Sequence, residues 1–159
     1  MEDKLHYLLN NFRAMYKVLE NDWERSAQNM GITKAEQHLL WIVYSEKEVT
    51  VSRLSDLCLL KVSTVMQVLK RMEEKRLINQ IKRQEDRRVT YVSMTTLGYE
   101  TIRTSTTFEY HFLNYFQEMD ESKRTQILDC VQDLNRHFYG DAFVQWVEKT
   151  DPKTPSLSK

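Results

Sequence analysis

The chain has 159 residues, enough for one domain or one compact two-lobed unit with a buried core. Its 23 Lys and Arg residues balance its 23 Asp and Glu residues, so the overall charge favours neither nucleic acid nor membrane as a partner. Three Gly and two Pro residues are typical of a helix-rich fold. We see no secretory leader and no apolar run near the roughly 20 residues that cross a bilayer, so we expect a cytoplasmic protein.

The basic residues are concentrated in the middle of the chain. Between Lys61 and Thr90 there are nine Lys or Arg residues against four Asp or Glu residues, whereas the remainder carries 14 basic and 19 acidic residues. This distribution fits a protein that touches a polyanion through one patch. Charge alone fits a solvated helix face beside a charged turn equally well.

One long amphipathic helix is predicted at the N-terminus, from Glu2 to about Gln28. Its apolar face is wide for a helix at the end of a small domain, so it needs a partner. That partner is either the chain's own C-terminal helices or a second copy. The face contains Leu5, Leu8, Leu9, Phe12, Met15, Tyr16, Leu19 and Trp23.

Two shorter helices are predicted before the basic segment. Thr33 and Glu36 have the spacing of a capping box, which predicts a helix from Lys34 to about Glu46. Thr50 is placed to cap a short third helix. The chain then turns at Leu59–Leu60, although no Gly marks that turn.

The helix from about Lys61 to Lys75 is central to our interpretation. Its apolar residues recur at helical spacing and predict a buried stripe of Val62, Val65, Leu69 and Met72. Hydroxyl, amide and cationic groups fall on the other side, where such groups could read base edges and hold phosphates in a DNA groove. These groups belong to Ser63, Thr64, Gln67, Lys70 and Arg71. The alternative is an ordinary exposed helix face.

The polar positions of this helix differ in chemistry. Gln67 can pair bidentately with adenine, whereas Ser63 and Thr64 suit phosphates or base edges. Lys61 and Lys70 suit backbone phosphates, a sequence-independent contact that weakens with salt.

Two strands joined by a charged tip follow, with Leu77–Ile81 pairing with Val89–Val92. The tip projects Arg83, Gln84, Arg87 and Arg88 beside the polar helix. Arg side chains are well suited to a narrow minor groove. We expect Asp86 to pair with a neighbouring Arg and orient the tip, because a carboxylate facing phosphate would repel it. The alternative is a solubilising hairpin.

The C-terminal third is predicted to be helical. Thr95 begins a helix that runs to about Met119, and Asp120 caps a last long helix that ends at Tyr139–Asp141. A short aromatic turn follows, and residues 149–159 are expected to be disordered. Aromatic residues between Phe108 and Phe116 could line an effector pocket, but such residues are more often core or dimer interface.

Two long terminal helices with wide apolar faces bury poorly within one copy, which indicates a homodimer. The expected dimer contacts are Leu5, Leu8, Phe12, Phe112, Phe116, Phe138, Phe143 and Trp146.

No motif indicates catalysis. Cys58 and Cys130 are far apart, and we expect both thiols to be buried and inert. The four His residues have no ligand spacing, so no metal or other cofactor is expected. A nucleophile–base set and a phosphate-binding loop are both missing, so we expect no enzymatic activity.

The order of these elements resembles the MarR family of winged-helix regulators. Three motifs carry the likeness: Val62–Thr64 in the polar helix, Asp86–Val89 at the tip, and Met94–Gly98 after it. The last is similar to the family's Leu-Thr-x-x-Gly. The chain departs from the common pattern at Arg76, where many members have Gly, and this puts the geometry of that turn in question. Outside the winged helix the chain is similar to the Hpr-type regulators of protease production and sporulation in bacilli. This likeness rests on the segments 21–23, 38–42, 90–92 and 139–141.

The resemblance implies a mainly α fold with a small β-wing, in which residues 33–95 form a winged helix-turn-helix DNA-binding lobe. Residues 1–32 and 96–148 would form the dimerisation helices. It implies a homodimeric regulator, most simply a repressor at the bacterial nucleoid, that reads a pseudo-palindromic operator and controls protease or sporulation-type genes. One wing-tip Arg, for which we favour Arg87, would enter the minor groove. In this family small-molecule effectors commonly bind between the dimer helices and the winged helix, but nothing in the sequence marks such a site. The alternative is a winged-helix module that binds a protein partner instead of specific DNA.

Overall fold

The computed structural model describes residues 2–150, and these divide into two compact units, one ending at Phe112 and the other beginning at Leu113. The predicted disordered tail lies outside the described residues from position 151 onward. No helix in the described part of the chain is both long and apolar enough to span a bilayer.

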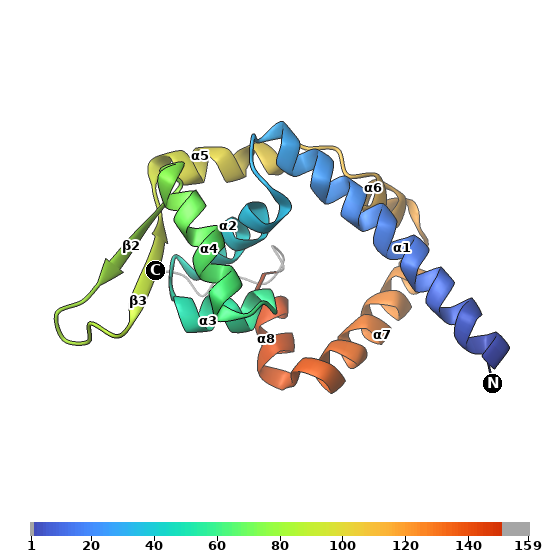
Figure 1. The fold of residues 1–159 in the computed structure, drawn as a ribbon. Helices are drawn as coiled ribbons and strands as arrows, with labels where there is room; N and C mark the ends of the chain where they lie inside the picture. Colours follow the sequence, from blue (N-terminus) through green and yellow to red (C-terminus); the bar gives the residue numbers. More distant parts are fainter. Residues whose placement is uncertain (1, 151–159) are drawn as a thin grey trace. The chain divides into compact units, whose positions relative to one another are not determined.

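The first unit combines five helices with a three-stranded sheet (Figure 1). Its elements are α1 (Glu2–Asn29), α2 (Lys34–Glu46), β1 (Glu48–Thr50), α3 (Val51–Cys58), α4 (Val62–Glu74), β2 (Ile78–Lys82), β3 (Thr90–Met94) and α5 (Thr96–Ser105). The antiparallel strands lie in the order β1-β3-β2, and the β2–β3 hairpin extends beyond the helices as a wing. Helix α6 (His111–Glu118) crosses into the second unit, which contains α7 (Glu121–Tyr139) and α8 (Asp141–Lys149).

The predicted caps are present and explain where the helices begin. Thr33 and Glu36 form a reciprocal capping box at the start of α2. Thr50 Oγ1 accepts a hydrogen bond from the backbone N–H of Arg53 at the start of α3. Asp120 accepts hydrogen bonds from two backbone amides in the first turn of α7. Each cap satisfies backbone donors that the helix itself leaves unpaired.

Strand β1 was not predicted from the sequence. It contains only three residues, of which Val49 is buried and pairs with Val92 of β3. Three residues are too few to establish an alternating pattern, so only the tertiary pairing identifies the strand.

The prediction of one helix from Thr95 to Met119 is wrong, because the chain leaves the helix after Ser105. Three successive hydroxyls, on Ser105, Thr106 and Thr107, donate to the carbonyl three residues earlier, and such local bonds compete with helical ones. The interruption brings the backbone N–H of Phe112 within 2.8 Å of Oδ2 of the buried Asp22 in α1. It therefore attaches α1 to the start of α6.

Two burial predictions are also wrong. Val62 was expected in the buried stripe of the polar helix, but 49% of it is exposed, and Val68 is buried in its place. Cys130 is exposed in the single chain, whereas Cys58 is buried as expected. Burial raises the pKa of the Cys58 thiol, which keeps it protonated and unreactive.

The turn after α4 takes the conformation that Gly adopts most easily, although Arg76 occupies it. Arg76 has φ +59°, in the left-handed region. The hydroxyl of Thr95 donates to the Arg76 carbonyl at 2.7 Å, and Thr95 N–H donates to the Leu77 carbonyl at 3.1 Å. These bonds from the β3–α5 junction hold the turn.

The close packing of α5 against Leu77 explains why the Met94–Gly98 motif ends in glycine. A Cβ at this position would lie 2.1 Å from the carbonyl oxygen of Leu77, closer than any real contact. Only glycine therefore allows α5 to approach the chain so closely where it enters β2.

We predict that Gly98→Ala lowers the free energy of unfolding by about 1–3 kcal/mol, because the new methyl group must push α5 away from Leu77. Urea unfolding followed by circular dichroism measures the change. Glu100→Ala, on the exposed surface of the same helix, is the control and should stay within about 0.5 kcal/mol of the parent protein. Equal stability of the two variants would contradict the close approach.

Candidate nucleic-acid interface

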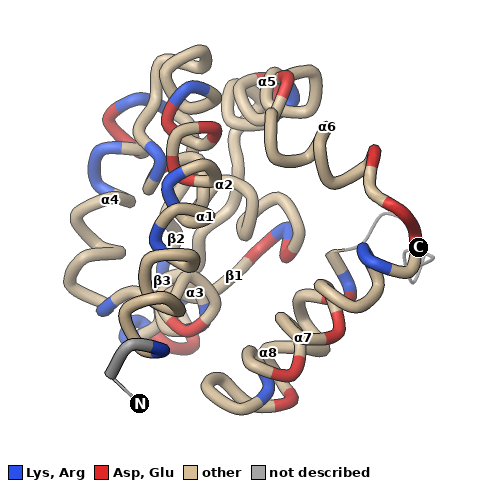
Figure 2. Tube along the Cα trace, turned by 90° about the vertical axis from the view of Figure 1, so that its right-hand side faces the viewer, with Lys and Arg blue, Asp and Glu red and all other residues tan. Residues whose placement is uncertain are grey.

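The outer face of α4 carries the polar groups that the sequence predicted. Ser63, Thr64, Gln67, Lys70 and Arg71 are all exposed, as is Lys61 at the N-cap. Lys and Arg positions along α4 are visible in Figure 2. The opposite face is buried through Val65, Val68, Leu69 and Met72. The core therefore fixes which side of the helix faces solvent.

A buried carboxylate holds the C-terminal end of α4 to the start of α2. Glu36 has no exposed surface, and its Oε2 accepts hydrogen bonds of 2.8 Å from both Lys75 Nζ and the backbone N–H of Thr33. Its Oε1 lies 3.9 Å from Nε of Arg71, an ionic contact rather than a hydrogen bond. One residue thus serves the α2 capping box and two cations of α4.

Two effects oppose each other at Glu36. Burial by itself would raise the pKa of the carboxyl group, because it disfavours the charged form. Hydrogen bonds from Lys75 and Thr33 outweigh burial, so the pKa lies below its ordinary value. Glu36 is therefore ionised at neutral pH, and Lys75 keeps a charged partner.

The cations of the wing fall into two groups. Arg83 pairs with Glu48 of β1, and its guanidinium lies 4.2 Å from the ring centre of Tyr91. Arg88 contacts Asp86 through its backbone N–H at 3.0 Å and its Nε at 3.4 Å. This contact identifies the Arg partner of Asp86 that the sequence left open. Arg87 is exposed and has no hydrogen bond or ion pair with any residue that the structure describes.

Periodicity did not identify an exposed apolar group beside the polar face. Leu59, Val62 and Met66 are 47%, 49% and 44% exposed. They lie at the turn before α4 and in its first two turns, on the side away from the buried Val65 and Val68. The only sequence signal for them is their position at the start of the helix.

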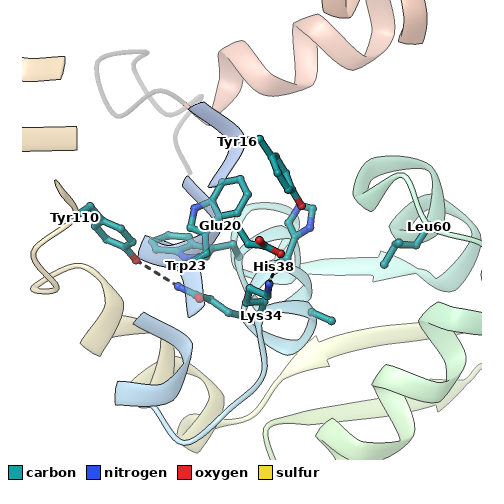
Figure 3. Close-up of a pocket in the computed structure, with 10 residues that line it drawn as sticks. Tyr16, Glu20, Trp23, Lys34, His38, Leu60 and Tyr110 are labelled. Atoms are coloured by element: carbon teal, nitrogen blue, oxygen red, sulfur yellow. Dashed lines mark hydrogen bonds and ion pairs between the residues drawn. The ribbon is translucent and has the colours of Figure 1, made fainter. Parts of the chain in front are cut away.

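A pocket of about 470 Å³ lies between α1 and α2 in the first unit (Figure 3). Its wall is largely aromatic, with Tyr16, Trp23, Trp41 and Tyr110. In Figure 3 the α1 side chains face Lys34 and His38 of α2. No group of three or more potential metal ligands occurs among the residues described.

The polar groups of the pocket are neutral in sum. Glu20 accepts from Lys17 at 2.8 Å and from Lys34 at 2.9 Å, and these bonds lower the pKa of Glu20 to about 2. Desolvation by its surroundings lowers the pKa of His38, although its side chain still reaches solvent, so this imidazole is uncharged at neutral pH. The amide nitrogen of Gln37 donates to Ser26 and Tyr110, but the buried Oε1 of Gln37 accepts no hydrogen bond from the described residues.

In a comparison with protein families, residues 32–90 match the MarR family. The matched residues coincide with the winged helix described above. Residues 32–90 form a MarR-family domain. The match begins just before the α2 capping box and ends at the first residue of β3, so it contains α4 and the wing tip.

Proteins similar to this chain extend the comparison beyond the MarR-family domain. Over 143 residues the chain is 29% identical to the HTH-type transcriptional regulator Hpr of Geobacillus thermodenitrificans, covering 86% of this chain and 71% of that protein. It is 28% identical over 150 residues to the DNA-binding transcriptional repressor ScoC of Bacillus subtilis, covering 86% and 70%. A mutant of MarR from E. coli, solved in complex with operator DNA, matches with a TM-score of 0.68 at 14% identity, covering 80% and 95%.

These comparisons confirm the MarR resemblance, its Hpr-type relatives and the mainly α fold with a small wing. The relatives are transcriptional regulators, so the prediction that the chain is not an enzyme is confirmed as well. The roles of individual side chains in the MarR-family domain stay predictions.

We predict that Glu36→Gln destabilises the protein by about 1–3 kcal/mol at pH 7, because Lys75 loses its charged acceptor. A carboxyl group whose pKa is lowered by folding contributes stability above its unfolded pKa, near 4.3, and loses it as the pH falls through the folded pKa. The parent protein should therefore lose stability on acidification below about pH 4.3 more steeply than the variant. Urea unfolding at several pH values measures both slopes, and Glu74→Gln on the exposed surface is the control. Parallel slopes would contradict the role of Glu36.

Proposed function

We propose that this protein is a homodimeric transcriptional repressor that binds a pseudo-palindromic DNA operator. The observation that carries the proposal is an exposed polar face on α4 beside an unpaired Arg on the wing, within a MarR-family domain. Both groups face solvent at positions that the fold fixes. The division into a DNA-binding lobe of residues 33–95 and dimerisation helices of residues 1–32 and 96–148 is part of this proposal.

In the proposed complex α4 lies in the major groove. Gln67 accepts from and donates to one adenine, while Ser63 and Thr64 contact base edges or phosphates. Lys61 and Lys70 hold phosphates. Arg71 also has a structural role, because its ionic contact with Glu36 helps to hold α4 against α2.

The three Arg residues of the wing have different roles. Arg87 enters the minor groove, since its guanidinium is free of competing bonds within the described chain and has nothing to give up on binding. Asp86 and Arg88 shape the tip through their mutual contact. Arg83 steadies the base of the wing against β1 and reaches phosphate only through its remaining donors.

Dimerisation is supported by the apolar surface that α1 exposes. Leu5, Leu8 and Phe12 are each about half exposed on one helical face. A contiguous apolar face of this kind is stabilised by burial against a second copy. The proposed contacts also include Phe112, Phe116, Phe138, Phe143 and Trp146. A two-fold axis would place two α4 helices roughly 34 Å apart, one turn of DNA.

The repressor assignment follows the relative named ScoC, and the protease and sporulation-type targets follow the Hpr likeness. A protein-interaction module is the competing function. Such a surface would present aromatic anchors at its centre, whereas the outer face of α4 presents amide, hydroxyl and cationic groups.

We predict that the double variant Gln67→Ala/Arg87→Ala loses operator affinity by about a hundredfold or more, because it removes one base contact and one minor-groove contact. The operator is first selected from genomic fragments with the parent protein, and affinity is then measured at several salt concentrations. The variant should remain dimeric in sedimentation equilibrium.

The matched control is Gln126→Ala/Arg103→Ala, which makes the same two substitutions at exposed positions on α7 and α5. It should bind like the parent protein. Full affinity of the α4 and wing variant would exclude the proposed DNA contacts, and a monomeric parent protein would exclude the dimer.

We also infer that the pocket between α1 and α2 accepts a small uncharged aromatic effector. The aromatic wall offers stacking surfaces, and the paired Glu20 and Lys34 leave no net charge for an ionic ligand. The volume is in the range that holds small ligands.

We predict that phenol raises the melting temperature and benzoate does not, because benzoate carries a charge that the paired Glu20 and Lys34 do not balance. Differential scanning fluorimetry measures both shifts. Trp41→Ala should weaken the response to phenol by removing one aromatic surface. Equal shifts for phenol and benzoate would contradict the preference for an uncharged ring, and an unchanged operator affinity with phenol bound would exclude an effector.

A further inference from the structure

The polar face of α4 is bordered by two apolar side chains that the fold does not bury. Val62 and Met66 are four residues apart, so they are neighbours on the helix surface. A rotation of about 100° per residue places them along one side of the face, with Ser63 and Gln67 along its middle. Val62 and Met66 are each nearly half exposed, whereas Val65, which lies between them in the sequence, is fully buried.

The first two turns of α4 contain no charged residue. From Val62 to Leu69 the helix offers hydroxyls, one amide and apolar groups, and the first cation is Lys70. Guanine is usually read by Arg or Lys, and cytosine by Asp or Glu. The N-terminal turns, which reach deepest towards the bases in this type of docking, therefore have no charged side chain for either of these contacts.

The major groove contains one apolar feature, the 5-methyl group of thymine. Gln67 selects the adenine of an A·T pair, and neighbouring thymine methyl groups would lie beside the row of Val62 and Met66. The two side chains differ usefully in stiffness. Val62 is β-branched and presents a fixed surface, whereas Met66 is flexible and can adapt to the methyl group.

We propose that Val62 and Met66 are specificity-determining residues that read thymine through its 5-methyl group, next to the adenine paired with Gln67. This inference rests on the proposed DNA-binding function and assigns the bases that its major-groove face selects. A protein partner is the less favoured occupant of the apolar side, because Lys61, Ser63 and Lys70 surround it with groups that suit a phosphate-lined groove.

The test replaces individual thymines of the selected operator by deoxyuridine, which pairs identically and lacks only the methyl group. Uracil at one or two positions of each half-site should weaken binding by the parent protein about threefold to fivefold each, the factor expected from losing one buried methyl-sized contact. Fluorescence anisotropy at constant salt measures the dissociation constants.

The variants Val62→Ala and Met66→Ala complete a thermodynamic cycle. Each should bind the thymine operator more weakly and lose its discrimination at one thymine, so that thymine and uracil operators bind alike there. Both residues are exposed and Ala favours helix, so folding should be unchanged, which circular dichroism checks. Lys61→Ala is the matched control and should weaken both operators equally, since it contacts phosphate in this proposal.

Three results would overturn the inference. Equal affinity of the parent protein for thymine and uracil operators would exclude methyl reading. Unchanged discrimination by both Ala variants would assign the methyl contact to other residues. A parent protein that selects no sequence at all would overturn the proposed function itself, and this outcome is distinct from the other two.

Discussion

The buried carboxylate of Glu36 is the contact on which the orientation of the proposed DNA-binding face of α4 depends. An ionised group without exposed surface is costly unless it is paired, so the fold must bring donors to it. It does so from two directions, with Thr33 at the start of α2 and Lys75 at the end of α4. Because Glu36 belongs to α2 and Lys75 closes α4, rotation of either helix would break the charged hydrogen bond between them. Burial of the apolar face of α4 stabilises its packing, and the bond between Glu36 and Lys75 fixes the orientation of α4 relative to α2.

A second junction connects α4 to the wing. Thr95 caps α5 and donates to the Arg76 carbonyl, while Gly98 lets α5 lie against Leu77. The segment Arg76–Leu77, between α4 and β2, is therefore joined to the segment Thr95–Gly98 at the start of α5. In the proposed complex this junction sets the distance between the major-groove helix and the minor-groove Arg. The sequence motif shared with MarR proteins is thus a structural joint beside the interface, and its residues need not touch DNA.

Local chemistry made the starts of several helices in both units predictable. Thr33, Thr50 and Asp120 are caps whose partners lie two or three residues away, so the sequence contains the whole interaction. Features that depend on distant partners were missed. Strand β1 exists through its pairing with β3, and Arg83 is held by Glu48, 35 positions earlier. Val62 fits the apolar period but is 49% exposed, because no other element covers it, and periodicity alone does not show which apolar positions are covered. The prediction of one helix over residues 95–119 was wrong because two kinds of hydrogen bond compete with the helical ones there. Side-chain hydroxyls bond to nearby carbonyls, and the backbone N–H of Phe112 donates to Asp22.

The conformation of Arg76 has a consequence for how tightly α4 and the wing are coupled. A non-glycine residue in the left-handed region stores strain on the order of 1 kcal/mol, which the bonds from Thr95 maintain. Glycine at this position would relieve the strain but would widen the range of backbone angles open to the free protein. With Arg76 at this position, α4 and the wing keep a narrower range of angles relative to each other in the free protein. In the proposed complex less conformational entropy then remains to be lost on binding, because the angle between α4 and the wing is already set in the free protein.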